Sequence, residues 1–96
     1  MTALSPRTFE IGSVTDQRLR VNVPIPVVAE KTGKGWLAEA VGLNEFGWGE
    51  GWGDAVEDLR STIGELYWIL KENQHRLGPE PQRIWDILRT TMEERP

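Results

Sequence analysis

The clearest pattern in the chain is an alternation of apolar and polar positions over residues 19–29. The odd positions are apolar and the even positions are polar or proline, with Val28 as the exception. A period of two with β-branched residues on one side predicts a half-buried β-strand. Pro24 and Pro26 lack backbone N–H groups on the same lateral side, so this side of the strand is expected to face solvent or a loop.

Two further strands are predicted after this one. The segment 31–35 contains two glycines and predicts a tight turn, from which residues 36–41 return as a second strand. A short third strand is expected around residues 46–50. A weaker alternation over residues 7–11 leaves open whether the N-terminal extension, residues 1–18, adds a short strand.

Helical spacing replaces the alternation after residue 53. Apolar residues recur every three or four positions and predict a long amphipathic helix over residues 54–77, ended by Gly78 and Pro79. Asp54 and Glu57 have the spacing of a capping box at its start. A second, short helix is expected from Pro81.

Together these elements predict an α+β fold. A three-stranded antiparallel sheet carries the long helix on one face, within a domain formed by residues 19–78. Residues 79–96 form the C-terminal helix.

Composition narrows the possible functions. Eleven Lys and Arg residues against 15 Asp and Glu residues give a formal net charge of −4, which argues against nucleic-acid binding through this chain alone. The absence of cysteine excludes disulfides, Cys-ligated metals and a thiol nucleophile, and the single histidine excludes sites that need two. No run is long and apolar enough to span a membrane. We expect a cytoplasmic, non-enzymatic protein that carries no cofactor and no metal.

Two groups of polar residues suggest chemistry but have simpler explanations. Glu30, Glu39, Glu50 and Asp54 could converge on a divalent ion, yet Glu39 lies within a predicted strand and Asp54 is explained as a helix cap. His75 lies near the predicted helix C-terminus, where a cation interacts favourably with the helix dipole.

The glycine-rich segment 47–53 precedes a helix, as a phosphate-binding loop does. It contains Glu50, is followed by Asp54 and lacks the lysine that such loops need. We therefore interpret it as a twisted strand in which glycines give room to the large indoles of Trp48 and Trp52.

The order and spacing of several segments resemble the HicB family of small antitoxins. These segments, within residues 27–70, are 27–30, 35–39, 49–59 and 63–67, and they lie in just under half of the chain. The resemblance implies a partial RNase H-like fold without the acidic metal cluster of true RNase H enzymes. It also implies binding to a small HicA-like toxin, an mRNA ribonuclease, whose active face the antitoxin masks. Only one short helix follows Gly78, in place of the DNA-binding module of full-length members, so operator DNA binding is not expected.

The residues predicted to bind a partner lie in and beside the segment 42–53. They combine apolar anchors with carboxylates, which suits a basic, partly apolar toxin surface, and they are Phe46, Trp48, Glu50, Trp52 and Asp54. The function predicted is neutralisation of a small basic HicA-like ribonuclease by direct binding, with homo-oligomers expected. The alternative is a stand-alone homo-oligomeric scaffold without a toxin partner. Whether the tryptophans bind a partner or fill the core is left open by the sequence.

Overall fold

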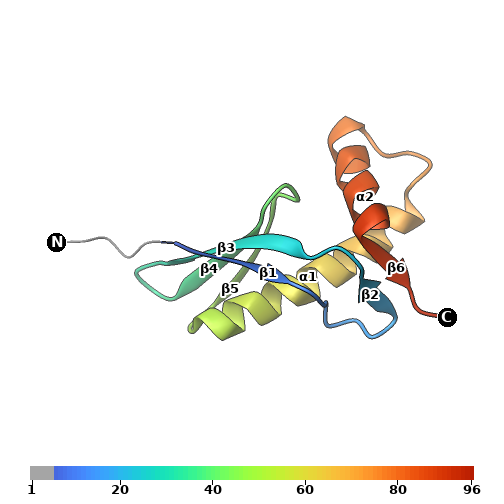
Figure 1. Cartoon of the computed structure of the whole chain (residues 1–96). Helices are drawn as coiled ribbons and strands as arrows, with labels where there is room; N and C mark the ends of the chain where they lie inside the picture. Colours follow the sequence, from blue (N-terminus) through green and yellow to red (C-terminus); the bar gives the residue numbers. More distant parts are fainter. Residues whose placement is uncertain (1–5) are drawn as a thin grey trace.

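The computed structural model describes residues 6–96 and contains six strands and two helices (Figure 1). In chain order these are β1 (Arg7–Ile11), β2 (Leu19–Val21), β3 (Ile25–Lys31), β4 (Trp36–Ala40), β5 (Glu45–Gly49), α1 (Trp52–Glu72), α2 (Pro79–Thr91) and β6 (Met92–Glu94). Strands β1, β3, β4 and β5 form an antiparallel sheet in that order, and β2 pairs with β6 in a separate two-stranded sheet. The molecule is elongated, with extents of 50 × 29 × 20 Å, and α1 joins its two ends.

The predicted α+β class, with an antiparallel sheet and two helices, is confirmed, and the main sheet has one strand more than the three predicted. Residues 7–11 form an edge strand, with Phe9 opposite Val27 of β3, so the main sheet has four strands. The single strand predicted over residues 19–29 is divided into β2 and β3. The backbone N–H groups of Asn22 and Val23 both donate to the Thr91 carbonyl, at 2.7 and 3.2 Å, which draws this part of the chain toward the C-terminus.

Pro26 is accommodated in β3 although β3 has a neighbour on each side. Its carbonyl accepts a hydrogen bond from the Val41 N–H at 2.9 Å, just after β4 ends. The nitrogen and carbonyl of one strand residue point to the same side, so the missing donor of Pro26 faces this turn and not β1. The proline-bearing side therefore faces a loop at this position, as the sequence predicts.

Small residues let α1 lie close to one face of the main sheet. Ala38 and Ala40 of β4 are fully buried there. A Cβ atom at Gly47 would lie 2.3 Å from the Ala55 carbonyl oxygen and from the Leu59 backbone nitrogen. The interpretation of the glycines is therefore corrected: Gly47 makes room for the helix backbone and not for an indole ring.

The helix boundaries also differ from the predictions. α1 begins at Trp52 after the N-cap residue Gly51, and no side chain caps it, so the predicted capping box of Asp54 and Glu57 is not formed. The helix ends at Glu72 and not at residue 77. Its last turn is closed by Asn73, whose Nδ2 donates to the Ile69 carbonyl at 2.7 Å. The second helix begins at Pro79, with Gly78 as its N-cap.

The C-terminal half of α1, α2 and the β2–β6 pair form the other end of the molecule. Tyr67 and Trp85 pack there with ring centroids 5.1 Å apart, and Leu88 and Met92 are almost fully buried beside them. These residues belong to the same hydrophobic cluster as the residues under the main sheet.

Candidate functional site

One face of the main sheet has no helix over it in the part of the chain that the structure describes. Helix α1 lies along the other face, and α2 packs on α1 and β6 at the far end of the molecule (Figure 1). Because side chains alternate along a strand, the register identifies the residues that face away from α1. We call this surface the open sheet face; its residues are Thr8, Glu10, Pro26, Val28, Glu30, Leu37, Glu39, Phe46 and Trp48.

Large apolar side chains are exposed on the open sheet face. Phe46 is 44% exposed and Trp48 is 50% exposed. Leu37 on the neighbouring strand β4 and Val28 on β3, the next strand along, are partly exposed. Scattered apolar residues are normal on a protein surface, but a contiguous patch that contains two aromatic rings is typical of an interaction site.

The charged residues of the open sheet face are all acidic. They are Glu10, Glu30 and Glu39, and neither lysine nor arginine alternates onto this face in residues 6–96. Glu39 lies between Val28 and Phe46 in one cross-strand row, and Glu30 faces Leu37 in the next. A hollow of about 210 Å³ in this face is lined by Val28, Glu30, Leu37, Glu39 and Phe46.

The structure divides the predicted binding residues between two sides of the sheet. Phe46 and Trp48 lie together on the open sheet face. Trp52 lies on the helix side, where its ring packs edge-on against Phe9 with centroids 5.5 Å apart. Glu50 and Asp54 lie near the start of α1, both exposed. The five residues therefore do not form one cluster.

Residues that the sequence interpretation did not select complete the surface. Val28, Glu30, Leu37 and Glu39 come from β3 and β4, outside the segment 42–53. Val28 is the exception in the alternation of residues 19–29. An apolar residue on the polar side of a strand indicates an exposed apolar surface, and this signal was available in the sequence.

The outer edge of β5 is held by α1. The Trp48 backbone N–H donates to Asp58 Oδ2 at 2.9 Å, which fixes the strand from which the Trp48 ring projects. A carboxylate that accepts from a strand edge also removes that donor from pairing with another chain. Trp48 is therefore presented by a supported strand.

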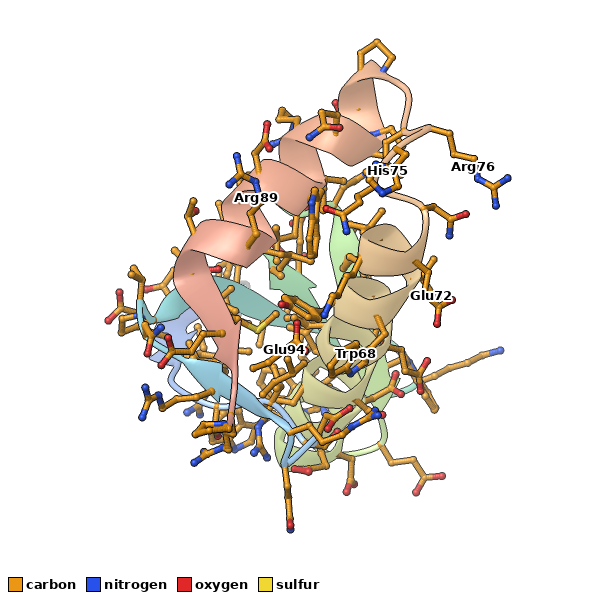
Figure 2. The ribbon with its side chains drawn as sticks, turned by 90° about the vertical axis from the view of Figure 1, so that its right-hand side faces the viewer. Trp68, Glu72, His75, Arg76, Arg89 and Glu94 are labelled. Carbon is orange, nitrogen blue, oxygen red and sulfur yellow. The ribbon has the colours of Figure 1, made fainter. Side chains whose placement is uncertain are left out.

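The carboxylates weighed as metal ligands do not converge. Glu30 and Glu39 lie on the open sheet face, whereas Glu50 and Asp54 lie near the start of α1. Within residues 6–96 no three His, Asp or Glu side chains are grouped so that they could hold a metal ion. His75 lies beyond the end of α1, in the connection to α2 (Figure 2).

A larger groove, of about 620 Å³, lies beside Trp68 on α1 and is lined by Thr15, Asp16, Arg18, Ser61, Glu65, Trp68, Ile69 and Glu72. Its central polar groups are already bonded to one another. Asp16 Oδ2 accepts from Arg18 Nη2 at 2.7 Å and from Trp68 Nε1 at 2.8 Å, and the Arg18 guanidinium lies 4.5 Å from the Trp68 ring centroid. These bonds, with Arg18 the larger contributor, hold the pKa of the Asp16 carboxyl well below its usual range.

Near Trp68, α1 is also bonded to the C-terminal strand β6. Lys71 forms an ion pair with Glu94 of β6, and Glu94 also accepts a hydrogen bond from the Tyr67 hydroxyl at 3.1 Å. Figure 2 shows Trp68 and Glu94 on this side of the molecule. Three of the residues that line the groove, Asp16, Arg18 and Trp68, are therefore bonded to one another and connect α1 to the segment before β2.

Comparisons with known proteins give no relative for this chain: no family model, curated protein or solved structure matches it. Within residues 6–96 neither helix has the length and apolar character needed to cross a membrane.

Proposed function

We propose that this chain is a non-enzymatic binding domain that captures a small basic protein on its open sheet face, as an antitoxin that neutralises an mRNA ribonuclease. The observation that carries the proposal is the exposure of Phe46 and Trp48 among Glu10, Glu30 and Glu39, on a sheet face over which residues 6–96 place no helix. The ribonuclease as partner rests on the resemblance to HicB-like antitoxins.

The two kinds of side chain on this surface serve different steps of binding. Aromatic side chains at the centre of an interface supply much of the affinity when they lose contact with water. Carboxylates around them attract a basic partner and raise the association rate. A ribonuclease needs basic residues to hold its RNA substrate, so the same residues give it a surface complementary to this one.

The rival function, a homo-oligomeric scaffold, is less well supported on this face. Two copies placed face to face would bring Glu30 and Glu39 of one copy near the same carboxylates of the other, and like charges in an interface are unfavourable. The outer edge of β1 pairs with no other strand of residues 6–96, and self-association through this edge is compatible with a partner on the open sheet face.

The test is co-expression with the protein of the neighbouring reading frame, where a small basic ribonuclease is expected. The native chain should relieve the growth arrest that this protein causes, whereas Phe46→Ala/Trp48→Ala should not. Ile69→Ala is the matched control, because Ile69 is 55% exposed but lies on α1. Rescue by the double variant equal to that by the native chain, or a neighbouring protein that neither arrests growth nor binds, would overturn the proposal.

A further inference from the structure

We infer that the hollow in the open sheet face accepts one arginine side chain of the partner. The hollow of about 210 Å³ is lined by Val28, Glu30, Leu37, Glu39 and Phe46. The inference deepens the proposed function, on which it rests for the existence of a protein partner.

The size of the hollow favours a single side chain. Its lining residues come from three adjacent strands, with Val28 opposite Glu39, Glu39 opposite Phe46 and Glu30 opposite Leu37. Side chains directly opposite each other on antiparallel strands have Cβ atoms about 5 Å apart. The five residues therefore surround a space that one long side chain can enter, and a helix or a second sheet would only lie across it.

The chemistry of the lining favours a cation with an apolar stem. Val28 and Leu37 offer apolar surface on which methylene groups can lie, and Glu30 and Glu39 offer carboxylates. Neither carboxylate forms an ion pair with another side chain of residues 6–96. The adjacent Lys31 does not compete, since its Nζ lies 5.7 Å from the ring centroid of Trp36 on the helix side of the sheet.

Phe46 makes arginine a better fit than lysine. A guanidinium group is planar, stacks on an aromatic ring and can donate to two carboxylates from different edges. The ammonium group of lysine is more strongly hydrated and cannot stack in this way. Because Phe46 lies directly opposite Glu39, one guanidinium group can contact both the ring and the carboxylate.

The experiment uses the full chain and N-acetylarginine amide as a probe, followed by NMR. We expect the probe at millimolar concentrations to shift the signals of Val28, Leu37 and Phe46. Glu30→Gln and Glu39→Gln should each weaken this binding, roughly threefold to tenfold.

The matched control for the glutamate variants is Glu10→Gln, because Glu10 lies on the same face but does not line the hollow. This variant should bind the probe like the native chain. The native fold of each variant is checked from the dispersion of its amide spectrum.

Comparison probes separate this inference from the proposed function. Nα-acetylnorleucine amide has an apolar side chain without charge. Nα-acetyllysine amide has a charged side chain without a planar group. If either probe shifts the same signals as strongly, or if the arginine probe leaves them unchanged, the assignment to arginine is overturned. The co-expression test with Phe46→Ala/Trp48→Ala does not depend on this outcome, so the two can fail separately.

Discussion

Trp48 and Trp68 each lie beside carboxylates, but the fold surrounds them differently. Trp68, on the C-terminal half of α1, donates to Asp16, and Arg18 and Lys71 lie 4.5 and 5.4 Å from its ring centroid. Trp48, on the open sheet face, is 50% exposed and has no cation within the distance of such a contact in the described structure. The same residue types are therefore bonded to one another at one end of the molecule and remain exposed at the other.

Layering explains this difference. The C-terminal end has elements on several sides: α1, α2 and the β2–β6 pair enclose Tyr67 and Trp85. Within residues 6–96 the main sheet has a helix, α1, on one face only, so no second layer covers the side chains of its other face. A small domain buries a limited fraction of its surface, and on an uncovered sheet face another protein can add the second layer.

The largest expected effect tests the C-terminal end of the molecule, where α1, α2 and the β2–β6 pair enclose Trp85. Trp85 is 6% exposed and packs against Tyr67, so Trp85→Ala should lower the free energy of unfolding by about 3–5 kcal/mol, because it leaves a cavity. Trp48→Ala should lower it by less than about 1 kcal/mol, because the ring is half exposed. Urea unfolding of both variants measures the difference. Equal losses of stability would mean that Trp48 belongs to the core.

The second effect concerns binding. Trp48→Ala should weaken the partner complex by about 2 kcal/mol or more, a loss typical of an aromatic residue at the centre of an interface. Trp52 is 43% exposed but lies on the helix side against Phe9. Trp52→Ala should therefore leave partner affinity within about 0.5 kcal/mol of the native value. Calorimetric titration of the two variants checks this, and a larger loss for Trp52→Ala would place the partner on the helix side of the sheet.

How far the sequence predicts this molecule depends on the range of the interactions involved. The strands from residue 25 to residue 49 and the helix face of α1 follow from local periodicity, which residues 19–70 show clearly. The break of the strand predicted over residues 19–29 does not follow from local periodicity. It depends on hydrogen bonds from Asn22 and Val23 to Thr91, far along the chain. The capping box failed because Gly51, and not Asp54, is the N-cap.

The proposed binding surface was predicted in part for the same reason. Phe46 and Trp48 stand out in the sequence because they are aromatic residues among glycines. Val28, Leu37 and Glu39 join them only through strand register, which the pattern of one segment cannot supply. Trp52 was grouped with them by proximity in sequence, although the turn after β5 carries it to the other side of the sheet.

A third, smaller effect tests the role of charge near the surface. Glu50 is exposed after β5 and lines neither the hollow nor the core. Glu50→Lys should lower the association rate of a basic partner, by roughly twofold to fivefold at low salt, and leave the dissociation rate nearly unchanged. Stopped-flow measurements at several salt concentrations check this, since added salt should remove the difference. A change confined to the dissociation rate would mean that Glu50 contacts the partner directly.

The smallest expected effect concerns Asp16, whose carboxylate is bonded to Arg18 and Trp68. The pKa of Asp16 is lowered in the folded protein, chiefly because its carboxylate accepts hydrogen bonds from Arg18. Folding therefore favours the ionised form, and this stabilisation is present above the ordinary carboxyl pKa of about 4 and is lost as the pH falls through the lower folded value.

Asp16→Asn should reduce the decline of stability with acid below about pH 4, and Arg18→Gln should do the same by removing the main partner. Urea unfolding over a pH series measures this decline. Because Arg18 is largely exposed, solvent screens the pair and the change in slope is small. An acid decline unchanged in both variants would show that the bonds to Asp16 do not couple its ionisation to folding.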